Sequence, residues 1–477
     1  MNEPDAEFAA EADHDVMPNR NARIDLSDPR LFRLILQLAI PSVVGLSINA
    51  LQQVVNAIFV GTLGAPAIAA VSMTLPIVVL LAAAGQGIGV GAASFISRHL
   101  GAGEYLEASR GASTALALAA PIGIAVTVVL FLNMREIFLA LGATPTIMPL
   151  ALDYATTLLF GCTLMLLNIV NGFIVRAEGN TRFSMWTMMT AFILNAGLDP
   201  VLITVLDLGV RGAALATLAS QTTAISLYVA YFIKRRGMVV VRMSHISLRA
   251  DRIRQIALVG APATVTSILS AITVVLLYGA AAPFGEESIA AVGIAVRLLT
   301  IGALLISGFS MGSQAILGFG WGARDFSRVL RAAKVLLSIT VALSVTYSAA
   351  IVIFARPLVR LFSDSDSVRE IAVSACTVFH LFFGLYGIES VATAMLQSLG
   401  RARLSAVVCF ARHYLFIPAV LLFPAISGFS GVLASQAIAE LGAGMIALFI
   451  MRRQFVELAQ CGRHIRSGGM TNASWPD

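Results

Sequence analysis

Charged residues are scarce in this chain. Only 12% of its 477 residues are Asp, Glu, Lys or Arg, whereas a soluble domain carries roughly 25%. A soluble protein of this length would have enough polar residues to cover its core, so the deficit excludes water as the only solvent. With 58% hydrophobic residues and a mean hydropathy of +0.87, the composition indicates lipid instead.

Cysteine and enzyme motifs are also scarce. The four cysteines (Cys162, Cys376, Cys409 and Cys461) lack metal or disulfide spacing, so we interpret them as small packing residues. The sequence contains no phosphate-binding Gly-Lys loop, no His-Glu-x-x-His and no nucleophile elbow. We therefore expect no enzyme, no metal and no other cofactor.

Apolar segments long enough to cross a bilayer recur along the chain. A spanning helix needs about 20 apolar residues, and helices are required because lipid offers no partner for free backbone groups. The sequence therefore predicts an all-α integral membrane protein with twelve transmembrane helices. Their approximate ranges are 34–60, 66–94, 113–132, 146–175, 184–206, 210–233, 253–281, 288–317, 331–354, 368–397, 404–425 and 430–451.

Basic residues favour one side of the membrane. The stretch between the sixth and seventh spans carries Lys234, Arg235, Arg236, Arg242, Arg249, Arg252 and Arg254. Loops on the other side are poorer in positive charge, with Arg135, Arg356 and Arg360 as exceptions. Because cytoplasmic loops are enriched in lysine and arginine, we expect both termini in the cytoplasm and the protein in the plasma (inner) membrane. We read the net charge of +6 as this loop bias rather than as a nucleic-acid site.

The second half of the sequence repeats the first at one constant offset in numbering. Pro41 corresponds to Pro262 at this offset, Gly87 corresponds to Gly308, and Gly91 corresponds to Gly312. Since each half has six spans, an even number, the halves form parallel repeats with one orientation. We expect two six-helix bundles. The predicted organisation is a cytoplasmic tail at 1–30, bundles at 31–234 and 253–453, a cytoplasmic linker at 235–252 and a cytoplasmic tail at 454–477.

Polar side chains are costly inside a bilayer, so those within the spans are candidate functional residues. Asn195 and Asp199 are four residues apart in the fifth span and share a helix face. Residues from four spans fall at similar depth in the outer half of the first bundle: Asn56, Tyr154, Asn195, Asp199 and Thr217. For the neutral residues, hydrogen bonds between helices are the simpler interpretation. The carboxylate of Asp199 points to function.

A second polar set predicts a substrate-binding cavity in the first bundle. Asn49 and Gln53 belong to a polar stripe on the first span that also includes Gln52 and Asn56, while Asn168 and Asn171 share a face of the fourth span. Met188 adds a flexible side chain that adapts to ligands of varied shape. Such a lining suits a promiscuous site.

The second half has embedded carboxylates of its own. Glu389 lies in the tenth span and Glu440 in the twelfth, and candidate partners are Arg297, Arg412 and His413. Two interpretations stay open. The carboxylates form either an alternative ion-coupling site or structural ion pairs that hold the bundle together.

Several motifs carry a family resemblance over residues 30–455. They are LAIPSV and VVNAIFVGTLGAPAIAAVS within 38–72, SRHLGAGEYLEASR at 97–110, ILNAGLDPVLI at 193–203, IAAVGIAVRL at 289–298 and GFGWGAR at 318–324. Together they resemble the multidrug and toxic compound extrusion (MATE) family. The resemblance implies a twelve-helix, two-bundle antiporter that exports amphipathic, often cationic, organic compounds in exchange for H⁺ or Na⁺ by alternating access.

The DinF-like branch of that family has an ion site in its N-terminal bundle. The resemblance implies that the corresponding residues here are Tyr154, Asn195, Asp199 and Thr217. The chain departs from the family at Asn56, where the motif V-D-x-I-F-V-G usually has Asp. The NorM-like branch has a C-terminal acid close to the position of Glu389.

Asp199 is the only carboxylate of the N-terminal set, which favours exchange of one proton per cycle. We expect Asn195, Thr217 and Tyr154 to hydrogen-bond it. Sodium needs several oxygen ligands, so weak Na⁺ binding at Asp199, Asn195 and Asn56 stays open.

Two other functions stay open as well. One is a flippase or an exporter of lipid-linked or anionic metabolites on the same superfold, and the other is a non-transporting membrane protein derived from it. The expected partners are small organic substrates and the lipid bilayer, without nucleic acid, and the expected state is a monomer.

Overall fold

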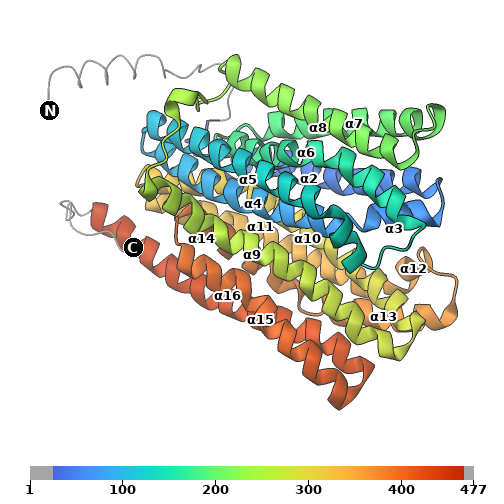
Figure 1. Ribbon diagram of the computed structural model, residues 1–477. Coiled ribbons are helices and arrows are strands. Elements are labelled where there is room, and N and C mark those ends of the chain that lie inside the picture. Colours follow the sequence, from blue (N-terminus) through green and yellow to red (C-terminus); the bar gives the residue numbers. More distant parts are fainter. Residues whose placement is uncertain (1–24, 467–477) are drawn as a thin grey trace. The chain divides into compact units, whose positions relative to one another are not determined.

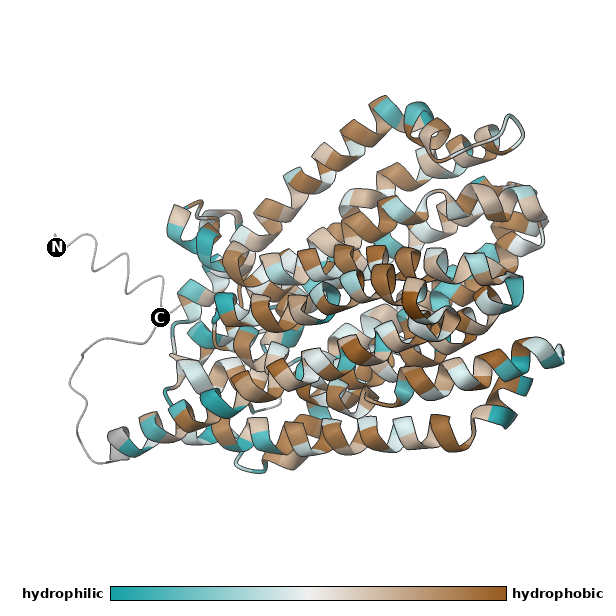
Figure 2. Cartoon of the chain, turned by 90° about the horizontal axis from the view of Figure 1, so that it is seen from below, coloured by the Kyte–Doolittle hydropathy of each residue, from teal (hydrophilic) through white to brown (hydrophobic). Residues whose placement is uncertain are grey.

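The computed structural model describes residues 25–466, the last three by their backbone alone. Every regular element in this range is helical, and twelve helical segments are long and apolar enough to cross a membrane (Figure 1). The predicted fold class, an all-α membrane protein with twelve spans, is confirmed. Hydrophobic residues run along the helices, and hydrophilic residues gather at helix ends and in the connecting loops (Figure 2).

The first six spans lie within residues 31–233. They are formed by α2 (Leu31–Gly61), α3 (Ala65–Ser72) with α4 (Leu75–Gly101), α5 (Tyr105–Ala140), α6 (Ile147–Ala177), α7 (Thr181–Pro200) with the π-helix η2 (Val201–Val205), and α8 (Gly209–Ile233). The apolar segments seen in the sequence predict each of these spans, but several helices extend beyond their apolar stretch by one or more turns.

The second six spans follow the same plan. They are α9 (Ala250–Ala281), α10 (Glu286–Gly322), α11 (Phe326–Ile353) with the short α12 (Ala355–Arg360), α13 (Asp366–His380) with α14 (Tyr386–Ser398), α15 (Ala402–Ser427) and α16 (Phe429–Arg466). The helix α16 continues well past the predicted span end at 451 and through the start of the predicted tail at 454. An ion pair at 2.6 Å between Arg401 and Glu457 fixes this polar extension.

The tenth span is a broken helix rather than the continuous one predicted over 368–397. It is interrupted between α13 and α14, which leaves backbone carbonyls without helical donors. Hydroxyls of α11 donate to carbonyls near this break: Ser344 Oγ donates to Gly384 O at 3.0 Å, and Thr340 Oγ1 donates to Gly387 O, at the start of α14, at 3.2 Å. Neighbouring hydroxyls are a common remedy for breaks in membrane helices. The break places Glu389 in the first turn of α14.

The chain forms two compact units that differ from the two halves of the sequence. The first unit contains Val44–Thr264 together with Asp25, and the second contains Leu26–Val43 and the chain from Val265 onward. The division therefore passes through α2 and α9, shortly after Pro41 and Pro262. Proline cannot donate to the carbonyl four residues earlier, so both helices are weakened there.

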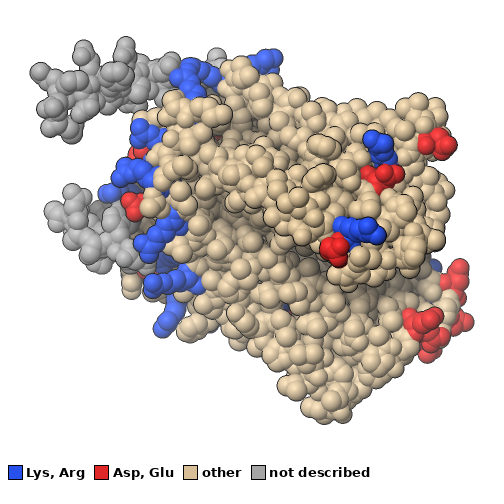
Figure 3. Space-filling model, viewed as in Figure 1, with Lys and Arg blue, Asp and Glu red and all other residues tan. Residues whose placement is uncertain are grey.

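The surface has the character expected in lipid. In the view of Figure 3 charged side chains lie toward the helix ends, and a broad band between them carries none. Large apolar side chains along the spans are exposed instead, among them Phe131 (65%), Phe160 (73%) and Ile233 (75%). Apolar exposure on this scale marks a membrane-facing surface.

Candidate functional site

Asp199 lies at the end of α7 in the first unit, one turn after Asn195. Both side chains are buried, Asp199 to 0% exposure. Pro200 follows directly, and because it lacks an N–H the helix continues as the π-helix η2. Such wide turns occur often at functional sites. Among the described residues neither carboxylate oxygen of Asp199 has a hydrogen-bond partner.

Two more helices contribute neighbours of this carboxylate. The Tyr154 hydroxyl on α6 interacts with the Asn56 side chain on α2 and, electrostatically, with Asp199. From α2, Gln52 Nε2 donates to Asn195 Oδ1 at 3.3 Å. The structure therefore brings four of the five predicted residues together. It adds Gln52, which the sequence analysis placed on the polar stripe but not in the site.

Thr217 is the fifth predicted residue, and its hydroxyl is used within its own helix. It donates to Ala213 O of α8 at 3.1 Å. None of the three hydrogen bonds expected at Asp199 is formed among the described residues: Thr217 bonds within its own helix, the Tyr154 hydroxyl interacts with Asn56, and Asn195 Nδ2 does not reach the carboxylate. The Asn195 Nδ2 and Asn56 Oδ1 atoms are buried without partners in the described chain.

The missing partners limit the charge that this site can hold. A buried, ionised carboxylate without a counter-charge or hydrogen bond is too costly to persist and becomes neutral instead. Asp199 is therefore stable either with a proton or with a cation beside it. The unpartnered oxygens of Asp199 and Asn56 are suitable ligands for a hard cation, which usually takes six or more.

The predicted substrate-lining residues lie on α2, α6 and α7 of the first unit. Asn168 Nδ2 donates to Gln221 O on α8 at 3.0 Å, and Asn171 is buried with an unpartnered Oδ1. Met188 packs against α2, its sulfur 3.0 Å from where a Cβ at Gly45 would lie. Asn49 and Gln53 are exposed. That these five side chains line one cavity stays a prediction.

The two carboxylates of the second unit, by contrast, both contact one arginine. Arg412 of α15 lies 2.8 Å from Glu389 of α14 and 2.7 Å from Glu440 of α16. Its guanidinium also stacks over the Tyr386 ring, 4.8 Å from the centroid. Of the other candidate partners, His413 pairs with Ser270 Oγ at 3.0 Å, and Arg297 is exposed.

The sequence and the fold can be compared with known proteins. A family model described as MatE matches residues 41–201 and, a second time, residues 262–422. The second match begins and ends at the positions that the internal repeat assigns to the ends of the first. This chain belongs to the MatE family. The resemblance of the sequence to multidrug and toxic compound extrusion transporters is thereby confirmed.

The MatE chain has relatives of almost the same length. Multidrug export protein MepA of Staphylococcus aureus (strain NCTC 8325 / PS 47) is 29% identical over 424 residues, which cover 88% of this chain and 93% of the relative. MepA of Staphylococcus saprophyticus is 26% identical over 422 residues, with the same coverage.

Solved MATE structures share the fold throughout. One is an outward-facing multidrug resistance MATE family transporter of the MOP superfamily, with a TM-score of 0.86, 26% identity, and coverage of 93% of this chain and 100% of that one. Another is a MOP superfamily transporter from Pyrococcus furiosus, with a TM-score of 0.85, 26% identity, and coverage of 93% and 99%.

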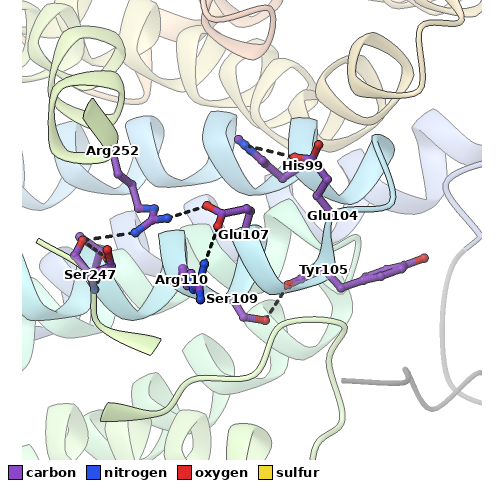
Figure 4. Close-up of polar contacts among 9 residues, drawn as sticks. His99, Glu104, Tyr105, Glu107, Ser109, Arg110, Ser247 and Arg252 are labelled. Carbon is purple, nitrogen blue, oxygen red and sulfur yellow. Dashed lines mark hydrogen bonds and ion pairs between the residues drawn. The ribbon is translucent and has the colours of Figure 1, made fainter. Parts of the chain in front are cut away.

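The MatE chain also contains an ion-pair network that the sequence did not predict. Glu107 of α5 contacts Arg110 at 2.8 Å and Arg252, at the start of α9, at 2.6 Å (Figure 4). The contact to Arg110 is a local i,i+3 pair that the sequence could have indicated. The contact to Arg252 spans 145 residues and becomes visible only in the fold.

Proposed function

We propose that this MatE chain exports amphipathic, often cationic, organic compounds from the cytoplasm in exchange for protons, by alternating access. The observation that carries the proposal is Asp199, a fully buried carboxylate without a hydrogen-bond partner in the described chain. The relatives of this chain in Staphylococcus are named multidrug export proteins. Those names support the substrate class, and the isolated carboxylate supports proton exchange.

The physical cycle follows from the cost of an uncompensated charge. When Asp199 is protonated, the site is neutral and stable in its buried position. Loss of the proton leaves a negative charge that must be balanced by a cation or solvated by opening of the site. A cationic substrate and a proton therefore compete to neutralise the same carboxylate, and exchange requires such competition. One carboxylate supports one proton per cycle.

Sodium is the weaker candidate for the coupling ion. Asp199, Asn195 and Asn56 offer oxygens, but only one of these residues can carry a negative charge. The residue types at Tyr154, Asn195, Asp199 and Thr217 support placement in the DinF-like branch, and Asn56 is the departure from it. The protein requires no other cofactor in this proposal.

We also assign the protein to the plasma (inner) membrane as a multi-pass monomer with both termini in the cytoplasm. The excess of lysine and arginine between the sixth and seventh spans supports this orientation. Its partners are then small organic compounds and the bilayer, and not nucleic acid.

The test is export of a fluorescent lipophilic cation by proteoliposomes with H⁺ and Na⁺ gradients imposed separately. Asp199→Asn should abolish gradient-driven export at normal expression. A matched control is Asp153→Asn, which removes an exposed carboxylate from α6 and should export normally. If Asp199→Asn still exports while Glu389→Gln does not, the coupling site is Glu389 with Glu440 in the second unit and the assignment to Asp199 is wrong.

A further inference from the structure

The start of α9 is fixed to the first unit, although α9 continues into the second. Arg252 is buried at 5% exposure and pairs with Glu107 of α5 at 2.6 Å (Figure 4). Thr114 of α5 accepts from Ser247 N at 3.3 Å and donates to Ser247 O at 3.2 Å. Both contacts lie within the compact unit that contains Val44–Thr264.

The linker before α9 is attached to the same unit. Glu178, at the end of α6, accepts from the backbone N–H of Val239 at 3.0 Å and from the Tyr231 hydroxyl at 2.8 Å. Ser109 Oγ of α5 accepts from Val240 N at 3.0 Å. The linker is therefore held against α5 and the end of α6 by hydrogen bonds.

Two repeat glycines bring the helix backbones into contact here. A Cβ at Gly91 of α4 would lie 2.1 Å from Ile256 O of α9, and one at Gly87 would lie 1.8 Å from Thr264 Oγ1. Larger residues at these positions would force α4 and α9 apart. The first part of α9, up to Thr264, is thus packed and ion-paired as a component of the first unit.

The second unit holds the first part of α2 in the equivalent way, at the repeat offset. A Cβ at Gly312 of α10 would lie 2.6 Å from Leu38 O, and one at Gly308 would lie 2.6 Å from Val43. Arg328 of α11, buried at 7% exposure, donates to Asp28 O at 2.9 Å and so holds the chain that enters α2. Arg328 occupies the position that the repeat assigns to Glu107.

The unit boundaries obey the same offset. The first part of α2 ends at Val43 and the first part of α9 ends at Thr264, which are again equivalent positions of the repeat. Each boundary lies two residues after a proline, Pro41 or Pro262, where the helix lacks a backbone hydrogen bond. The contacts of Glu107 and Arg328, the close-packed glycines and the unit boundaries all fall at equivalent positions of the repeat. Such agreement is not expected if the two attachments were unrelated.

We propose that Glu107 and Arg328 are positioning residues for transport, and that the rigid bodies that move are the two compact units rather than the two sequence halves. In this scheme the first part of α9 stays with the first unit throughout the cycle. The first part of α2 stays with the second unit. Bending is confined to α2 after Pro41 and to α9 after Pro262. The proposal rests on the proposed export by alternating access.

Spin-label distances test the rigid bodies without relying on export. The background is the full-length protein with its four cysteines replaced by serine. Labels at Glu104→Cys and Arg249→Cys measure a distance within the first unit. Labels at Arg249→Cys and Ala323→Cys measure a distance between the two units. All three positions are exposed. Between acid and alkaline pH, with and without a lipophilic cation, the first distance should stay constant while the second changes. A change in the first distance, or no change in the second, would overturn the proposal.

A covalent bridge tests whether the first part of α9 stays attached to the first unit during transport. In the same background, Glu107→Cys and Arg252→Cys are joined by a short bis-methanethiosulfonate, which forms a reducible disulfide with each thiol and releases sulfinate. Export by the bridged protein should remain within about twofold of that by the cysteine-free parent, because the bridge replaces the contact that the two substitutions remove. Ser27→Cys with Arg328→Cys should behave likewise in the second unit. A bridge that stops export, with recovery on reduction, shows that the half-helix must leave its unit and refutes the proposal. If the reduced variants and the wild-type protein all fail to export, the proposed function fails, and the spin-label distances still decide the moving bodies.

Discussion

At the scale of the residue, two buried carboxylates have opposite surroundings. Glu440 is at 0% exposure and lies 2.7 Å from Arg412, whose single positive charge it shares with Glu389. Asp199 is equally buried but has no hydrogen-bond partner among the described residues. A carboxylate that shares an arginine is partly compensated within the protein, whereas an isolated one must exchange its proton or bind a cation. This contrast favours Asp199 as the coupling residue.

The ion pairs of Arg412 predict a stability effect. Arg412→Leu leaves the carboxylates of Glu389 and Glu440 buried together, and removing one partner of a buried pair costs about 3–5 kcal/mol. The purified variant should therefore unfold at a clearly lower temperature. Arg297→Leu is the control, because Arg297 is exposed on α10. Equal unfolding temperatures for the two variants would show that the pairs contribute no stability.

The departure at Asn56 predicts a gain of function. Asn56→Asp places a second carboxylate beside Tyr154, in a site that already holds Asp199. Because hard cations gain most from full negative charge, export in a sodium gradient should increase several-fold over that of the wild-type protein. Asn133→Asp, at an exposed position of α5, should give no such gain. An unchanged sodium dependence for Asn56→Asp would place the ion elsewhere.

Much of this site was predictable from residue spacing and depth. Asn195 and Asp199 share a face because they are four residues apart, and orientation puts Tyr154 and Asn56 at their depth. The individual hydrogen bonds were not predictable, because each donor had several acceptors within reach. Thr217 bonds to the carbonyl four residues earlier, and Gln52 instead of a predicted residue reaches Asn195.

At the scale of the element, η2 sets the position of the chain after Asp199. A Cβ at Gly212 of α8 would lie 2.6 Å from Leu202 O of η2, so the two backbones touch. Gly212→Val should displace η2 and cost about 1–3 kcal/mol through overpacking, with reduced export. Gly197→Ala on α7 is the control, because a Cβ there meets nothing within 4 Å. Normal export and stability for Gly212→Val would show that η2 tolerates displacement.

The spans themselves follow from apolar length, whereas breaks and extensions depend on contacts distant in sequence. The interruption after α13 is stabilised by hydroxyls of α11, and the end of α16 by Arg401. Hydropathy alone joins α13 and α14 into one continuous span and ends α16 too early. The attachment of half-helices at Arg252 and Arg328 depends likewise on partners far along the chain.

At the scale of the whole molecule, orientation decides what transport means. Reporter fusions after Gly64, Arg242 and Glu286 test it. The excess of basic residues predicts a cytoplasmic signal at Arg242 and exterior signals at Gly64 and Glu286. An exterior signal at Arg242 would reverse the topology and turn the proposed export into uptake.

The central claim is that Asp199 exchanges a proton for a cationic substrate. Acid-loaded proteoliposomes with an internal pH dye measure this exchange directly. Adding a lipophilic cation outside should accelerate proton loss through molecules whose cytoplasmic face is outward, and Asp199→Asn should remove that acceleration while retaining the fold. Proton loss that is indifferent to the cation, or equal in the wild-type protein and Asp199→Asn, would contradict the account.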